Sequence, residues 1–200
     1  MDYPVVYKAG VENYAYYESK GYDKQYSKDG VIWADYECTF PELSQNTTLY
    51  GHNWHNIYTP RTQANMQAND LMFSLVMSYN YTDFAQENPF IYFSTTEQDY
   101  VFQVFASYYT DLNFGYNYAQ MSQEDFQKVI AEAKAKSLSN YNVPVTSEDK
   151  IVTLSTCTRV HGNTNNQRFV VMAKLVPVGT PSTTISTHSN PIAYNSSIDA

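Results

Sequence analysis

Short runs of apolar and β-branched residues recur along the chain, each bounded by polar or turn-forming residues. They cover residues 4–7, 31–36, 47–50, 90–94, 100–108, 150–155 and 169–176. Several runs are continuously apolar rather than alternating, and this is typical of strands covered on both faces. The pattern therefore predicts a mainly β domain, a barrel or a sandwich, with peripheral helices in its longer connections.

Two longer segments have helical periodicity, and a third is short. Ser122 opens a pattern typical of a capping box, with Glu124 and Asp125 in the first turn and apolar residues following at helical spacing. This predicts a long helix over residues 122–139. An apolar stripe predicts a second helix over residues 66–79. A short third helix is expected to begin at Thr82.

The composition suits one folded domain followed by a tail. A chain of 200 residues is long enough to bury a core without disulfide or metal support. A hydrophobic content of 43% excludes disorder for most of it. Residues 177–200 turn to Ser, Thr, Asn and Pro with almost no apolar periodicity. We predict a domain over residues 1–176 and a flexible polar tail over residues 177–200.

The formal charge is -8, from 20 acidic and 12 basic residues. Nucleic-acid binding needs a concentrated basic face, so we expect no nucleic-acid partner. The longest apolar run, residues 71–76, is broken only by Ser74 and is much shorter than the about 20 residues of a membrane-spanning helix. No signal-peptide pattern follows Met1, and we interpret this abrupt start as a natural N-terminus that has been trimmed away together with any export signal or anchor.

Cys157 is the first candidate for chemistry. It ends an apolar strand pattern and precedes a polar stretch, so a rigid strand would hold its thiol beside an accessible loop. Taken alone, a cysteine in an apolar run is more often an inert core residue. A nearby imidazole or guanidinium would instead favour the nucleophilic thiolate.

The chain has four histidines. His52 follows a strand pattern and a glycine, so its ring could lie over the same end of the sheet as Cys157, although spacing does not prove proximity. His55 comes three residues later, but the pair is spaced unlike the HExxH pattern and lacks further zinc ligands. We interpret His161 and His188, in polar surroundings, as solvated side chains.

Two arginines could assist the thiol. Arg168 begins the apolar strand pattern after Cys157, where it would meet an anion or carbonyl, or form a salt bridge at the rim. Arg159 is two residues past Cys157 and would point to the same face in an extended segment. The sequence does not choose firmly between them.

These motifs together resemble the sortase family, in particular its class B. Residues 153–157, Thr-Leu-Ser-Thr-Cys, resemble the TLxTC signature. Residues 49–53, Leu-Tyr-Gly-His-Asn, resemble the strand carrying the family's histidine, and the strand from Arg168 resembles the one opened by its arginine. Further similar segments extend the resemblance over most of residues 2–176. The long helix before the cysteine strand resembles class B rather than class A.

The resemblance implies a closed eight-stranded sortase β-barrel at the extracellular face of the membrane in a Gram-positive cell envelope. It implies that Cys157 attacks the scissile carbonyl of a C-terminal sorting signal and forms a thioester. His52 would move protons between the leaving and incoming amines, and Arg168 would steady the oxyanion or orient the peptide. We add as candidate substrate contacts Ser155, Thr156, Trp54 and Tyr108.

The resemblance also implies the partners. The sorting signal would be NPxTx-like or of a pilin type, and the acceptor amine would come from a peptidoglycan precursor or a pilin. The thioester route needs no cofactor and no metal. Specificity is expected to depend on the loops 54–70 and 110–120, of which the first is an apparent insertion beside the site.

Two features depart from the family pattern. The loop from Cys157 to Arg168 is longer than expected and contains Arg159, which keeps the alternate arginine open. Cys38 stands where class B members more usually have a polar residue. It is either a stray free thiol or a regulatory thiol able to form a reversible disulfide with Cys157, which requires a Cα separation below about 7 Å.

Two other classes remain as alternatives. An L,D-transpeptidase or papain-like hydrolase would also use cysteine and histidine, but the former places His-Gly before its cysteine, whereas His161 and Gly162 follow Cys157 here. A non-catalytic wall-binding domain is disfavoured by the intact cysteine, histidine and arginine.

Overall fold

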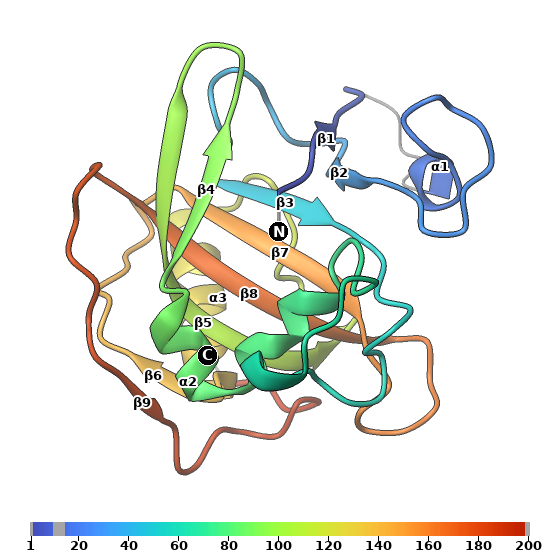
Figure 1. Cartoon of the computed structure of the whole chain (residues 1–200). Helices are drawn as coiled ribbons and strands as arrows, with labels where there is room; N and C mark the ends of the chain where they lie inside the picture. The colour runs from blue at the N-terminus through green and yellow to red at the C-terminus, as the bar shows by residue number, and fades with distance from the viewer. Residues whose placement is uncertain (1, 10–14, 199–200) are drawn as a thin grey trace.

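The computed structural model describes residues 2–9 and 15–198 (Figure 1). Its main sheet has seven strands in the spatial order β1-β2-β3-β7-β8-β5-β4, and a small second sheet pairs β6 with β9. The strands are β1 (Val5–Val6), β2 (Ile32–Ala34), β3 (Asn46–Tyr50), β4 (Phe90–Ser94), β5 (Asp99–Asp111), β6 (Ser139–Tyr141), β7 (Ile151–Cys157), β8 (Gln167–Val176) and β9 (Ile185–Thr187). The helices are α1 (Ala15–Glu18), α2 (Thr82–Glu87) and α3 (Gln123–Lys136), with the 3-10 helices η1 (Gln63–Asn65) and η2 (Ser74–Asn80).

The predicted mainly β fold with peripheral helices is confirmed. All seven predicted runs form strands, with bounds that shift by a few residues, and β6 and β9 were not predicted. The central strands β7 and β8 are buried along most of their length, as their continuous apolar runs indicated. Helix α3 packs on β5 and η2 packs on β7 and β8, which supplies the cover (Figure 1).

Closure of the sheet differs from the predicted eight-stranded barrel. The sheet is an open half-barrel with β1 and β4 at its edges, and among the described residues no backbone ladder joins those edges. Side chains bridge them instead: the Phe40 ring lies 4.7 Å from that of Tyr7 and 6.0 Å from that of Phe93. Pro41 has no N–H for a ladder, and its carbonyl accepts from the Tyr100 hydroxyl at 3.2 Å.

The predicted helices have different outcomes. The prediction of α3 is confirmed, with Ser122 as N-cap accepting from the Asp125 N–H at 3.1 Å, and the short helix at Thr82 is confirmed as α2. The prediction of a helix over residues 66–79 is wrong, because the 3-10 helix η2 is the only helix that forms in this described segment. Asp70 accepts from the backbone N–H of Gln67 at 2.8 Å, and this local turn competes with a helix. Among the described helices, none is long and apolar enough to span a membrane.

The polar segment predicted as a flexible tail lies along the domain in this structure. Strand β9 pairs with β6, and the Ile185 side chain at its start is buried. Farther on, the backbone N–H of Ile192 donates to the carbonyl of Ala135 at 2.9 Å. These contacts are tertiary, so the polar composition of the segment gave no sign of them.

Two histidines interpreted as solvated take part in this packing. The His161 ring stacks on Tyr194, with ring centroids 4.5 Å apart and an interplanar angle of 9°. Nδ1 of His188 lies 2.7 Å from the carbonyl oxygen of Ser137. The His161 side chain nevertheless remains exposed, as interpreted, and that of His188 is half-buried.

Candidate active site

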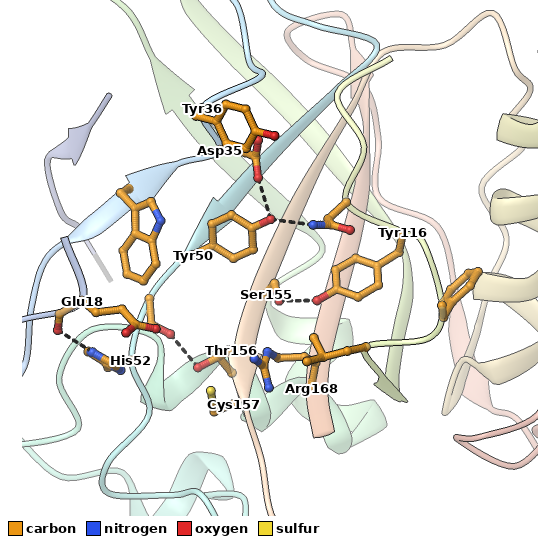
Figure 2. A pocket seen from close by; sticks show the side chains of 15 residues that line it. Glu18, Asp35, Tyr36, Tyr50, His52, Tyr116, Ser155, Thr156, Cys157 and Arg168 are labelled. Carbon is orange, nitrogen blue, oxygen red and sulfur yellow. Dashed lines mark hydrogen bonds between the residues drawn. The ribbon is translucent and has the colours of Figure 1, made fainter. Parts of the chain in front are cut away.

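A pocket of about 240 Å³ opens where β3, β7 and β8 end (Figure 2). Its lining includes the predicted trio Cys157, His52 and Arg168. The remaining lining comes from α1, β2, β3, β7, the residues just after β2 and β3, and the connection after β5, namely Glu18, Trp33, Asp35, Tyr36, Tyr50, Gly51, Leu112, Phe114, Tyr116, Asn117, Ser155 and Thr156. The structure thus brings a histidine together with a cysteine and an arginine that follow it by more than a hundred positions in the sequence.

Strand register explains why the three side chains meet. Strands β3 and β7 are parallel, with Tyr50 opposite Ser155. Both strands run towards the same end of the sheet. His52 comes two residues after Tyr50 and Cys157 two residues after Ser155, so the two lie beside each other. Strand β8 is antiparallel to β7 and places Arg168 directly opposite Cys157. In Figure 2 the sulfur of Cys157 lies between the imidazole and the guanidinium.

Hydrogen bonds tie the strand end that carries Cys157 to the segment that carries His52. The Thr156 hydroxyl donates to the carbonyl of Gly51 at 2.7 Å. The Asn53 amide donates to the carbonyl of Cys157 at 3.3 Å. Because Thr156 is buried and its hydroxyl is engaged, its contribution is to hold the two segments together.

Gly51 is needed at the turn before His52 for steric reasons. A Cβ at this position would lie 2.5 Å from Cδ1 of Ile32 and 2.7 Å from Cγ of Phe73. The backbone N–H of Phe73 also donates to the carbonyl of His52 at 2.9 Å, which fixes the chain just after the glycine. A side chain here would push the histidine away from the cysteine.

The two candidate arginines occupy different places. The guanidinium of Arg168 lines the pocket and donates to the backbone carbonyls of Asn165 at 2.9 Å and Gln167 at 3.0 Å. Among the described residues, no carboxylate forms an ion pair with it. Arg159 lies outside the pocket lining and donates to the Asn165 side chain at 2.8 Å and the Tyr58 hydroxyl at 3.4 Å. The geometry favours Arg168 as the arginine beside the thiol.

A polar network that the sequence did not reveal forms the opposite wall. The Tyr50 hydroxyl donates to Asp35 at 2.8 Å and accepts from the Asn117 amide at 2.9 Å. The hydroxyls of Tyr116 and Ser155 lie 2.7 Å apart. Burial raises the pKa of both tyrosines, so they remain neutral donors. The sequence did not single out Tyr50 and Tyr116, because they are two of 20 tyrosines with no distinguishing motif.

Two predicted substrate contacts lie outside the pocket lining. Tyr108 is completely buried in β5, with its hydroxyl 3.4 Å from the sulfur of Met172. It was predicted wrongly, because its position in the strand points it into the core. Trp54 is 45% exposed and packs against His52, with ring centroids 4.9 Å apart.

The insertion 54–70 packs beside the β7–β8 loop. The carbonyl of Ile57 accepts from the backbone N–H of Arg159 at 2.7 Å, and Arg61 pairs with Asp70 at 3.3 Å. None of the pocket-lining residues comes from this insertion. Its predicted role in specificity remains a prediction.

Cys38 does not fit the predicted disulfide with Cys157. Both thiols are free, and Cys38 is buried with its sulfur 4.0 Å from the carbonyl oxygen of Thr48. Thr48 pairs with Thr153, which lies four residues before Cys157 on β7. Four residues of strand span roughly 13 Å, well beyond disulfide reach. Burial raises the pKa of Cys38 to about 11, which makes it an inert core thiol.

Comparison with known proteins agrees with this geometry. The family described as the sortase domain matches residues 2–176. Sortase B of Staphylococcus aureus is 30% identical over 179 residues, which are 89% of this chain and 66% of that protein, just under two thirds of its length.

Solved structures show the same similarity. The Staphylococcus aureus sortase B–substrate complex superposes with a TM-score of 0.72 at 29% identity, covering 88% of this chain and 74% of that one. A sortase B complexed with triglycine superposes with a TM-score of 0.71 at 29% identity, covering 88% of this chain and 75% of that one.

Proposed function

Because the chain belongs to the sortase family and to its class B, we propose that it is a cysteine transpeptidase acting on a C-terminal sorting signal. The observation that carries the proposal is the pocket in which Cys157 lies between His52 and Arg168. A thiol, an imidazole and a cationic donor are the three groups that acyl transfer through a thioester requires.

The chemistry follows from the positions of these groups. The Cys157 thiolate attacks the scissile carbonyl carbon, and the oxyanion that forms is stabilised by the Arg168 guanidinium. The C–N bond then breaks as His52 gives a proton to the leaving amine. An incoming amine attacks the thioester, loses its proton to His52 and releases the thiolate. Each cycle returns both side chains to their starting protonation states.

The absence of a paired carboxylate supports the role of Arg168. Among the described residues its guanidinium is held only by backbone carbonyls, which carry partial charge. Its positive charge is therefore available to a developing oxyanion in the pocket. Arg159 is directed towards Tyr58 and Asn165 and is the weaker candidate.

The substrate proposals follow the family. We propose a sorting-signal peptide, NPxTx-like or of a pilin type, as the acyl donor and a peptidoglycan-precursor or pilin amine as the acceptor. A similar sortase B has been solved in complex with triglycine, a peptide that carries such an amine. The place of action would be the outer face of a Gram-positive cell membrane, with the protein held there by an N-terminal anchor.

Three side chains are proposed to meet the peptide. Ser155 and Thr156 line the pocket beside Cys157, with their hydroxyls engaged by Tyr116 and Gly51. They would contact the peptide through their remaining surface rather than through a free hydroxyl. Trp54 has an exposed face next to His52 and would contact the peptide or the acceptor at that end.

The test is a coupled cleavage and transfer assay. The protein is mixed with a panel of fluorogenic sorting-signal peptides, with and without triglycine, and products are identified by mass spectrometry. We expect a transpeptidation product and a protein whose mass is increased by the peptide acyl group bound to Cys157 as a thioester. Both should be lost in Cys157→Ala. Equal product from the two proteins would refute the role of the thiol. Hydrolysis that triglycine does not divert would instead support a cysteine hydrolase.

A further inference from the structure

Residues 15–30, which we call the N-terminal strap, lie against the candidate histidine. The strap contains α1 and returns to the sheet at Gly30, just before β2. The backbone carbonyl of Glu18, at the end of α1, lies 2.6 Å from Nε2 of His52 (Figure 2). The last carbonyls of a helix have no partner within the helix, so this oxygen is free to accept a hydrogen bond from elsewhere.

The strap also holds the aromatic ring that packs on His52. The indole N–H of Trp54 donates to the carbonyl of Lys28 at 2.9 Å. The ammonium of Lys28 lies 5.6 Å from the centre of the same ring. Because the Trp54 and His52 rings are 4.9 Å apart, the strap fixes the imidazole from two directions.

Gly30 sets the position of the Glu18 carbonyl. Its φ is +60°, a conformation that favours glycine, and a Cβ there would lie 2.8 Å from the Glu18 oxygen and 3.0 Å from the Tyr17 oxygen. Both contacts are with backbone, which has no side-chain freedom to move aside. A side chain at Gly30 must therefore displace the carbonyl that faces His52.

We propose that the N-terminal strap positions His52 for proton transfer, with the Glu18 carbonyl selecting the tautomer of its ring. A carbonyl oxygen only accepts hydrogen bonds, so Nε2 must carry a hydrogen. In the neutral ring Nδ1 is then the bare nitrogen, and it takes the proton from the incoming amine. This role rests on the proposed transpeptidase function, and Gly30 and Trp54 are positioning residues within it.

The tautomer can be measured without any turnover. Long-range 1H–15N correlation spectra of the neutral His52 ring, assigned with a His52→Gln variant, should show a protonated Nε2 and a bare Nδ1. In Gly30→Ala the spectrum should shift towards a mixture of tautomers. A bare Nε2 in the wild-type protein, or an unchanged ring in Gly30→Ala, would overturn the inference even if the protein proves to be an active transpeptidase.

Kinetics provides the second measurement, with a matched control. Gly179→Ala introduces the same kind of backbone strain, because the φ of Gly179 is +86°, but its Cβ would have no atom within 4 Å. Gly30→Ala should lower kcat by about 10- to 100-fold with little change in KM, the penalty expected for a misplaced catalytic group. Gly179→Ala should match the wild-type protein.

The outcomes separate this inference from the proposed function. An inactive wild-type protein with the expected tautomer defeats the transpeptidase proposal and leaves the ring contact intact. An active wild-type protein with equal kcat in both glycine variants defeats the inference. If Gly30→Ala does not fold, Trp54→Phe replaces it, because phenylalanine keeps a ring against His52 but removes the N–H that donates to the Lys28 carbonyl. The His52 spectrum of this variant should shift towards a mixture of tautomers, and an unchanged spectrum would overturn the inference.

Discussion

Lys136 offers a sharp test of the packed C-terminal segment. Its ammonium donates to the carbonyls of Tyr194 at 2.9 Å and Ala193 at 3.3 Å, and also to that of Ser196. It lies 3.4 Å from the carboxylate of Glu132, and both side chains are buried. Burial lowers the pKa of Lys136, while the nearby Glu132 opposes that shift.

The substitution Lys136→Met keeps the length of the side chain and removes its charge. The Glu132 carboxylate is then buried without a cation, and removing one partner of a buried ion pair costs about 3–5 kcal/mol. The carbonyls of the C-terminal segment also lose their donor, at about 1–3 kcal/mol for each that stays dry. Because this segment can move away and admit water, we expect a total near the lower value, about 3 kcal/mol of unfolding free energy.

Urea unfolding followed by tyrosine and tryptophan fluorescence measures this loss. The double variant Lys136→Met with Glu132→Leu should recover a large part of it, since replacing both charges by apolar groups is often neutral. Lys128→Met is the matched control, because Lys128 forms an exposed pair with Glu124 on the same helix. We expect no change in its unfolding midpoint. A Lys136→Met midpoint equal to that of the wild type would refute the reasoning.

Three further predictions concern the thiols, the arginines and a histidine. Iodoacetamide should label Cys157 in the native protein and Cys38 only after unfolding, as peptide mapping would show, because burial raises the pKa of Cys38 to about 11. Native labelling of both thiols would contradict this. Replacing Arg168 by Gln should lower kcat about 10²- to 10³-fold, whereas the same change at Arg159 should have little effect on transpeptidation; the reverse order would assign the role to Arg159. Burial lowers the pKa of His161, so the unfolded chain binds more protons and stability should fall as the pH drops below about 6.5. The difference in unfolding free energy between the wild type and His161→Phe should therefore depend on pH between about 7 and 5, and a constant difference would contradict the role of burial.

The sequence by itself determined the elements with strong local signals. The continuous apolar runs predicted the central strands, because only a strand covered on both faces is apolar throughout. The Ser122 cap predicted the start of α3, because one side chain satisfies the first free N–H groups of a helix. The motifs around His52, Cys157 and Arg168, in this order along the chain, predicted the sortase family. These features depend on neighbouring residues and are therefore readable along the chain.

Local patterns misled where tertiary contacts dominate. Residues 66–79 have a helical stripe, but a turn at Asp70 and the backbone contact of Phe73 with His52 interrupt the helix. Tyr108 resembled a substrate contact, but the pleat of β5 directs it into the core. The polar segment 177–198 makes backbone hydrogen bonds and side-chain contacts with α3 and the β7–β8 loop, which composition does not report, while its flexibility stays a prediction.

The tertiary structure alone decided which side chains share the pocket. Parallel pairing of β3 with β7 places His52 beside Cys157, and antiparallel pairing with β8 places Arg168 opposite it. The same pairing keeps Cys38 out of reach of Cys157. The packing of the N-terminal strap brings the Glu18 carbonyl to His52. Strand register is a relation between distant segments, so the sequence could supply the candidate groups while only the folded sheet could set their distances.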